Sequence, residues 1–309
     1  MIDQDKAIKI YARGGLGNQL FQYGAAFHLS HLLNLPIFVD SVLVSTNAKF
    51  NTGLGKRSLE LNSFENGLNF LPEKSKFASR LQSKILGINR LAGDYFPKLL
   101  IKLGTYANEF NDQIEIFNQI KSPISLNSYC STPKYFFDCG QEVTSQITKI
   151  KNPTNWYFEW QQKIQSEKPI GLNIRLGDYQ NLKNIYGEVD PEYYFSSVEL
   201  LRNLLGERPI WIFSDDPELA QRILEPKFGK LQFVSHPENR RPIEYLNVLA
   251  NCEGIVCANS SFSWWGAYVA SQQNSEVKVV FPRPMFNTTK FKEPFNWLPS
   301  NWITLGRKI

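Results

Sequence analysis

The chain has 309 residues, of which 42% are apolar and 14% aromatic, and a formal net charge of +5. This length accommodates two α/β domains, the apolar content excludes a disordered chain, and the mild basic excess gives no support for nucleic-acid binding. No apolar run approaches the roughly 18 residues of a membrane-spanning helix, and the N-terminal segment lacks the apolar core of a secretion signal, so we expect a cytoplasmic protein.

The N-terminal stretch 8–40 has the pattern of a strand, a glycine-rich turn, a helix and a second strand. Residues 8–12 form the first apolar run, and the second apolar run ends at Asp40. Helical spacing follows the turn, with small residues at 24–26 that permit close packing on a sheet. The residues at this spacing are Leu16, Leu20, Tyr23 and Phe27.

The glycine turn is similar to a dinucleotide-binding fingerprint but departs from it. Gly15 and Gly17 match the first two glycines, whereas Leu20 occupies the position of the third. NAD binding is therefore a poor fit. The turn still directs backbone N–H groups toward a ligand, and Asn18 and Gln19 add amide donors beside them.

A basic segment follows a stretch, 41–72, for which the sequence predicts only loops and short elements. Residues 73–102 contain seven Lys and Arg against Glu73 and Asp94. A basic amphipathic helix of this kind can contact an anionic membrane surface or a lipid-linked acceptor. The commoner arrangement packs the stripe on its own domain, and we expect that here. The apolar stripe comprises Phe77, Leu81, Ile85 and Ile88.

The second half of the chain alternates strands and helices, which predicts βαβ units and a parallel sheet. Strands are expected at 170–175, 209–213, 231–235, 254–258 and 277–281. Helices are expected at 191–205, 217–224, 242–251 and 261–271. The periodicity breaks at 150–156, so we place an N-terminal domain at 1–153 and a C-terminal domain at 154–309. Two α/β domains of this kind leave a cleft that suits a small molecule.

The segment GLNIRLGDY, 171–179, places polar groups at the carboxyl end of a strand. Asn173 and Arg175 share one strand face, and the strand ends at Gly177. Ligands of open α/β sheets bind at this end, and the fork of an arginine suits a phosphate. The alternative is an ion pair between Arg175 and Asp178 that closes the loop.

The segment IFSDDPEL, 212–219, runs from a strand into a helix that begins at Pro217. Ser214 or Asp215 either caps this helix or contacts a ligand. Asp215-Asp216 is not a D-x-D motif and has no acidic group nearby, so we expect no metal. The four cysteines lack metal-ligand spacing and are expected to be reduced structural thiols rather than disulfides. They are Cys130, Cys139, Cys252 and Cys257.

The segment GIVCANSSFSWWGAYVA, 254–270, predicts a buried strand followed by a helix start. The N–H groups, dipole and hydroxyls at such a start form an anion site, and Phe262 could stack on a base. The alternative is a serine cap without a ligand. Trp264 and Trp265 are expected in the core. The polar candidates are Asn259, Ser260 and Ser261.

Four blocks of this sequence, GGLGNQLFQY, IRLGDY, FSDD and ANSSFSWWGA, resemble those of the α-1,2-fucosyltransferases of glycosyltransferase family 11, in the same order. The resemblance spans residues 14–266 and implies a GT-B fold with two Rossmann-like domains facing a central cleft. It also implies GDP-L-fucose as the donor and metal-independent, inverting transfer to a galactose 2-hydroxyl, with no cofactor. Asn173, Leu176 and Gly254 replace a histidine, an arginine and a histidine that are usual in the family.

The resemblance also implies roles for individual residues. Arg175 matches the arginine directed at the β-phosphate of the donor, and the N-terminal domain lies on the acceptor side. The attacking hydroxyl needs a base, for which Asp178 is the first candidate and Glu188 the second. The donor-binding candidates are Gly15, Gly17, Asn18, Gln19, Asn173, Arg175, Ser214, Asp215, Asn259, Ser260, Ser261 and Phe262.

Three alternatives remain open on the sequence. One is fucosyl transfer with another linkage, α-1,6 or to a protein hydroxyl. Another is a sugar-binding module that has lost turnover, prompted by the replacements at Asn173 and Leu176. The acceptor is expected to be a galactose-terminated oligosaccharide, and a lipid-linked acceptor would make the cytoplasmic protein peripheral at the inner face of the membrane.

Overall fold

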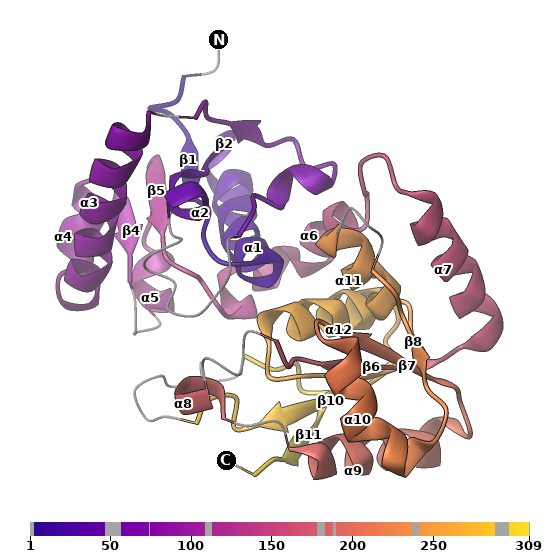
Figure 1. Cartoon of the computed structure of the whole chain (residues 1–309). Helices are drawn as coiled ribbons and strands as arrows, with labels where there is room; N and C mark the ends of the chain where they lie inside the picture. The colour runs from indigo at the N-terminus through magenta and orange to yellow at the C-terminus, as the bar shows by residue number, and fades with distance from the viewer. Residues whose placement is uncertain are drawn as a thin grey trace. The chain divides into compact units, whose positions relative to one another are not determined.

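A computed structural model of the chain describes residues 3–46, 57–73, 75–108, 113–177, 183–187, 190–236, 241–287 and 297–308 (Figure 1). The chain divides into two compact units, Met1–Lys149 and Ile150–Ile309. Each unit has its own parallel sheet. The division lies four residues before the boundary that we expected after Pro153.

The N-terminal unit is built on a parallel sheet of five strands in the order β3-β2-β1-β5-β4. The central strand β1 pairs in parallel with β2 on one side and β5 on the other. The expected strand–turn–helix–strand start of the chain is present as β1, α1 and β2. The strands are β1 (Ile8–Tyr11), β2 (Ile37–Asp40), β3 (Asn69–Phe70), β4 (Thr105–Ala107) and β5 (Ile124–Asn127).

Helices cover both faces of this sheet, with α1 on one face and α3 and α4 on the other (Figure 1). The helix α1 ends at Asn34, which adopts a left-handed conformation that asparagine tolerates. The helices of the N-terminal unit are α1 (Leu16–Leu33), α2 (Val42–Thr46), α3 (Lys76–Tyr95), α4 (Pro97–Lys102), α5 (Ile114–Phe117) and α6 (Gly140–Ile147). Short 3-10 turns occur at Leu61–Ser63, Pro133–Tyr135 and Phe137–Cys139.

The C-terminal unit has six parallel strands in the order β11-β10-β9-β6-β7-β8. The chain starts in the middle at β6, winds outward through β7 and β8, and returns to β9 on the other side of β6. This is the doubly wound order, in which β6 and β9 flank the switch point. The strands are β6 (Ile170–Ile174), β7 (Ile210–Ser214), β8 (Gln232–Phe233), β9 (Gly254–Val256), β10 (Lys278–Arg283) and β11 (Ile303–Gly306).

Five of these strands match the expected ones within a few residues, whereas β11 was not predicted, because its exposed alternate side chains give a weak apolar signal. Within the unit, α11 and α12 pack together on one face of the sheet, and α9 and α10 cover the other (Figure 1). The helices are α7 (Asn155–Glu167), α8 (Lys183–Tyr186), α9 (Pro191–Leu205), α10 (Pro217–Phe228), α11 (Pro242–Ala250) and α12 (Ser261–Gln273).

Local chemistry explains where the helices of the C-terminal unit begin. Both α9 and α10 start with an aspartate whose carboxylate caps the first turn, followed by proline, which suits a position without an N–H partner. Helix α10 continues to Phe228, past the expected end at 224, because Pro226 lies in the last turn and removes a single hydrogen bond.

Buried side chains of the two units confirm two expectations. Trp264 and Trp265 are fully buried side chains of α12. All four cysteines lie within the described ranges, are buried, and form no disulfide. Burial raises the pKa of the Cys139 thiol to about 12, and it raises the pKa of the Cys257 thiol well above its usual value. These thiols are therefore neutral packing groups and not nucleophiles.

The basic segment after residue 73 folds into α3 and α4, but its apolar stripe does not pack on the unit as expected. Phe77, Leu81, Ile85 and Ile88 are all exposed. That expectation is wrong, because α3 packs through its opposite side. No described helix is both long and apolar enough to cross a membrane.

Candidate functional site

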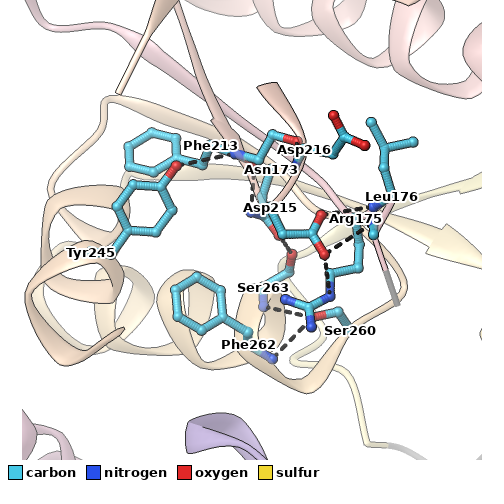
Figure 2. Close-up of polar contacts among 12 residues, drawn as sticks. Asn173, Arg175, Leu176, Phe213, Asp215, Asp216, Tyr245, Ser260, Phe262 and Ser263 are labelled. Carbon is cyan, nitrogen blue, oxygen red and sulfur yellow. Dashed lines mark hydrogen bonds and ion pairs between the residues drawn. The ribbon is translucent and has the colours of Figure 1, made fainter. Parts of the chain in front are cut away.

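The polar segments that the sequence singled out in the C-terminal unit meet at one edge of its sheet. The loop after β6 carries Arg175, the loop after β7 carries Asp215, and the loop after β9 leads to Ser260. Because β7, β6 and β9 are neighbours and parallel, their carboxyl ends lie together at the switch point. Figure 2 shows these side chains converging.

Arg175 is held in place by Asp215, the first of the two aspartates after β7. The guanidinium Nε lies 3.2 Å from the Asp215 carboxylate, and the two side chains are 26% and 18% exposed. The same carboxylate accepts hydrogen bonds from the backbone N–H groups of Leu176 and Gly177, at 2.8 and 3.1 Å (Figure 2). Asp215 therefore shapes the loop that presents the arginine.

The described structure gives Arg175 an ion-pair partner in Asp215, and the ion pair with Asp178 that we weighed as an alternative stays a prediction. Asp178 and Glu188, the two candidate bases, lie outside the described residues. A side chain at Gly177 would bring its Cβ to 3.0 Å from a carboxylate oxygen of Asp215, so the loop favours glycine at this position.

Ser214 and Asp215 do not cap α10, contrary to one sequence interpretation. The cap is Asp216, whose carboxylate accepts from the N–H of Leu219 at 3.1 Å. The Ser214 hydroxyl accepts from the N–H of Asp216 at 3.1 Å and is buried. The three residues thus divide three tasks, and spacing alone could not assign them.

Asn173 lies in a buried polar chain that crosses the sheet. Its amide nitrogen donates to the carbonyl of Phe213 at 2.9 Å, and its amide oxygen accepts from the hydroxyl of Ser263. That hydroxyl also accepts from the N–H of Ala258 at 3.0 Å. Both polar ends of Asn173 are used within the fold, so its expected contact with a donor finds no support here.

The start of α12 is capped by its own serine. The Ser260 hydroxyl accepts hydrogen bonds from the N–H groups of Phe262 and Ser263 at 3.1 and 3.4 Å. Ser261 is different, because neither its N–H nor its hydroxyl has a hydrogen-bond partner in the described part of the chain. Figure 2 shows the Arg175 side chain pointing toward this helix start. The combination places positive charge and a helix dipole together, which suits an anion.

Asn259 ties two loops together. Its amide nitrogen donates to the carbonyls of Tyr186 and Met285, at 3.0 and 3.1 Å. Arg307, which the sequence analysis did not mention, donates from its guanidinium to the same two carbonyls. An arginine near the end of the chain, outside any motif, gave no signal for this role.

Aromatic rings gather beside the α12 start around Tyr245 of α11. Its ring lies 6.2 Å from that of Phe262 and 5.1 Å from that of Phe213, between ring centroids. Its hydroxyl accepts from the N–H of Ser214 and donates to the carbonyl of Val234, both at 3.1 Å. Sequence reasoning missed Tyr245, because one tyrosine in an apolar helix resembles ordinary core. Phe262 is only partly buried, so its ring keeps an accessible surface.

The glycine turn of the N-terminal unit is organised by Gly14 and Gln19. Gly14 has a φ of +76°, a conformation that favours glycine, and a Cβ there would lie 2.5 Å from the Asn18 amide nitrogen. Gly15 precedes α1 and no side chain caps the helix, and Gly17 is buried in its first turn. The position that requires glycine is therefore Gly14, one residue before Gly15, the first glycine of the fingerprint.

Gln19 holds a second segment against this turn. Its amide nitrogen donates to the carbonyls of Gly14 and Ser58, at 2.9 and 2.8 Å, and its amide oxygen accepts from the N–H of Glu60 at 2.9 Å. Burial raises the pKa of the Glu60 carboxyl, an effect that the Ser58 hydroxyl and the Arg57 charge reduce. Gln19 is thus occupied within the fold, whereas Asn18 makes no hydrogen bond in the described part of the chain.

No group of three or more His, Cys, Asp or Glu side chains that could hold a metal ion occurs among the described residues. The concentrated positive charge at the C-terminal switch point comes instead from Arg175 beside the α12 start. This arrangement can bind a phosphate and stabilise negative charge that develops on it.

The chain is similar in sequence to known proteins. The family described as Glycosyl transferase family 11 matches residues 90–305. An alpha-1,2-colitosyltransferase of Escherichia coli is 25% identical over 298 residues, which is 95% of this chain and 97% of the relative. The O-antigen biosynthesis glycosyltransferase WbnK of Escherichia coli is 25% identical over 293 residues, which is 88% of this chain and 93% of the relative.

Solved structures resemble the fold. A crystal structure of NodZ alpha-1,6-fucosyltransferase soaked with GDP-fucose has a TM-score of 0.50 and 12% identity, covering 85% of this chain and 92% of that chain. A NodZ structure co-crystallised with GDP gives the same TM-score at 13% identity over the same shares of both chains. NodZ is a protein of Bradyrhizobium. Together with the two parallel-sheet units, these likenesses confirm the GT-B-like fold expected from the sequence.

Proposed function

Because the chain belongs to glycosyltransferase family 11, we propose that it transfers L-fucose from GDP-L-fucose to the 2-hydroxyl of a terminal galactose, with inversion. The observation that carries this proposal is the pairing of Arg175 with Asp215 at the switch point, next to the start of α12. A guanidinium in a fixed orientation beside a helix start fits a diphosphate leaving group.

In the proposed mechanism these groups stabilise the departing GDP. The acceptor hydroxyl attacks the anomeric carbon opposite the departing GDP, and negative charge grows on the β-phosphate. Arg175 stabilises that charge together with the N–H and hydroxyl of Ser261, which have no partner in the described structure. Because Asp215 already orients the guanidinium, little reorganisation is needed as the charge develops.

Phe262 is proposed to contact the guanine base. Its ring rests against Tyr245 on one side and is only partly buried, so stacking needs no rearrangement of the core. Ser214 and Asn259 support the loops around this site rather than contacting the donor.

The N-terminal unit is proposed to hold the acceptor. Asn18 at the start of α1 is the amide most available for this, because Gln19 is committed to the segment at Ser58 and Glu60. A galactose-terminated oligosaccharide presents hydroxyls that such an amide can bind.

The general base is proposed from the sequence as Asp178, with Glu188 next. Asp178 follows Arg175 by three residues. In the Asp178→Asn variant, transfer should fall far more than donor affinity, which calorimetry with GDP-fucose measures beside kcat. Weaker donor binding with kcat preserved at saturating donor would exclude Asp178 and direct the same test to Glu188.

A second candidate function is transfer of colitose, which the full-length similarity to an alpha-1,2-colitosyltransferase favours. Colitose is L-fucose without its 3-hydroxyl, so the two donors present the same diphosphate to Arg175. A site that hydrogen-bonds the 3-hydroxyl discriminates strongly against the deoxy sugar, whereas an apolar one does not. Competition between GDP-fucose and GDP-colitose for a limiting acceptor measures this preference directly.

The deciding experiment incubates the chain with GDP-fucose, alone and with lactose, and identifies the product linkage by NMR. An α-1,2-linked product supports the proposal. Product with an α-1,6 linkage, or transfer only to a protein hydroxyl, would assign another fucosyltransferase activity. Saturable donor binding without hydrolysis or product would indicate a sugar-binding module.

A further inference from the structure

The helix α3 packs on its unit through a narrow side with few large apolar residues. The residues facing inward are Ser79, Leu86 and Gly93, which are buried and recur every seven residues. On the opposite side of the helix, large apolar side chains face solvent, which inverts the usual amphipathic arrangement. We call this side the outer face. On α3 it consists of Phe77, Leu81, Ile85, Ile88, Leu91 and Tyr95.

The packing of the inner side prevents α3 from turning this face inward. At Gly93 the helix lies so close to β4 that an added Cβ would come within 1.8 Å of the carbonyl oxygen of Ala107. The side chains of Asn127 and Gln113 donate to the carbonyls of Leu86 and Gly93, at 2.8 and 3.0 Å. The helix is therefore locked in this rotation.

Helix α4 lies beside α3 (Figure 1), and we include its exposed apolar side chains in the outer face. Phe96, Leu99 and Leu103 are exposed there. Single exposed apolar residues are ordinary, but this segment exposes nine large apolar side chains, among them Phe77 at 80% and Tyr95 at 79%. Contiguous patches of this kind mark a surface that another partner covers.

The charges around the outer face are mostly positive, and Asp94, at the helical position of Lys76, is the one acidic residue of α3. Lys76, Arg80, Lys84, Lys98 and Lys102 are exposed, and none forms an ion pair with a described carboxylate. Lys84 lies within the apolar stripe by helical position, and the others border it. Flexible cationic side chains beside apolar ones let the apolar groups enter a membrane while the charges stay at lipid phosphates.

We propose that the outer face of α3 and α4 docks on an anionic membrane surface, with both helices lying in the plane of the lipid headgroups. Phe77, Tyr95 and Phe96 would insert at the headgroup boundary, where aromatic rings are favoured. A symmetric dimer through this face fits less well, because it would set like charges against each other. The proposal concerns the N-terminal unit alone and does not depend on the donor or linkage.

Sedimentation of the full chain with vesicles, without donor, tests the proposal. We expect binding to vesicles that contain phosphatidylglycerol, weak binding to phosphatidylcholine alone, and a decrease with salt. The affinity of the apolar variant for these vesicles should fall roughly thirtyfold or more. This variant combines Phe77→Ser, Ile88→Ser and Leu91→Ser. Its circular dichroism and thermal unfolding should match the parent chain, because these side chains make few contacts.

Its matched control removes three apolar side chains of other helices that are 49–56% exposed, and it should bind like the parent. This control combines Leu32→Ser, Phe158→Ser and Leu204→Ser.

A charge variant separates the electrostatic contribution. Reversal at Arg80→Glu and Lys84→Glu should weaken binding to anionic vesicles roughly twentyfold or more. The control, Lys227→Glu with Lys230→Glu, reverses two exposed charges of the C-terminal unit and should have little effect.

Three results would overturn the proposal. The first is equal binding to neutral and anionic vesicles, and the second is an equal loss of vesicle binding in the variants and their controls. The third is a dimer of the parent chain in sedimentation velocity without lipid, together with a monomeric apolar variant. The last result would assign the outer face to a second copy of the chain.

Discussion

Each of the two units has an arginine after a central strand of its sheet, but the surroundings of the two arginines differ. In the N-terminal unit Arg13 follows β1 closely, and in the C-terminal unit Arg175 follows β6 directly. Arg13 is 5% exposed and its guanidinium lies 3.6 Å from the ring centroid of Tyr129. Arg175 is 26% exposed and paired with Asp215. The neighbours of an arginine near the end of a central strand thus decide whether it is buried beside an aromatic ring or held partly exposed by a carboxylate.

The amides near the two switch points show the same division. Gln22 of α1 is fully buried and joins the ends of β1 and β5, because it accepts from the N–H of Arg13 and donates to the carbonyls of Tyr11 and Ser128. Asn173 plays the equivalent part between β7, β6 and α12. The amides therefore stabilise the strand ends in both units.

The largest expected effect comes from Arg175→Ala. Transfer should fall roughly a hundred- to thousandfold, equivalent to about 3–4 kcal/mol, because a donor for the developing charge is lost. Unfolding free energy should change by less than about 1 kcal/mol, as for a partly exposed ion pair. Arg175→Lys should also transfer poorly, since a point charge does not replace the fork. Steady-state kinetics with GDP-fucose and urea unfolding give both values, with Arg222→Ala as the exposed control. Activity within tenfold of the parent would move the phosphate site elsewhere.

Gln22→Leu should produce the opposite pattern, a loss of stability in the N-terminal unit. Three buried backbone groups lose their partner, which should cost roughly 2–4 kcal/mol of unfolding free energy. Urea unfolding followed by circular dichroism measures it. Gln141→Leu, at an exposed position of α6, is the matched control and should be nearly neutral. An unchanged midpoint for Gln22→Leu would show that the strand ends hold together without this amide.

Asp215→Asn tests whether the aspartate acts through the arginine. The amide keeps one acceptor oxygen but loses the charge that orients Arg175. We therefore expect kcat/KM to fall roughly ten- to a hundredfold, which corresponds to about 1.5–3 kcal/mol of transition-state stabilisation. Asp216→Asn is a close control, because asparagine caps a helix as well as aspartate does. Equal effects of the two substitutions would contradict a special role for Asp215.

Removal of metal should have the smallest effect. EDTA should leave transfer unchanged, because Arg175 and the α12 start supply the positive charge that a cation would otherwise provide. The assay is transfer to lactose after chelation, with and without added manganese. Loss of activity that manganese restores would contradict this account and return Asp215 and Asp216 to consideration as ligands.

Much of the fold could be predicted because it depends on local patterns. The apolar runs of the second half predicted the strands from β6 to β10, and the helices expected to start at 191 and 217 begin there as α9 and α10. The motifs also identified Arg175 and the α12 start as a phosphate site candidate. The strand β11 escaped prediction because its side chains are at most half-buried.

The sequence by itself determined which segments alternate, where the helices start, and which polar residues stand at strand ends. Only the tertiary structure decided that β9 lies beside β6, that Asp215 pairs with Arg175, and that Asn173 is internal. Strand order and side-chain partners depend on contacts between residues far apart in the chain, which a local pattern does not encode. The stripe on α3 shows the same limit, because its periodicity revealed an apolar side while the close approach at Gly93 determined that this side faces outward.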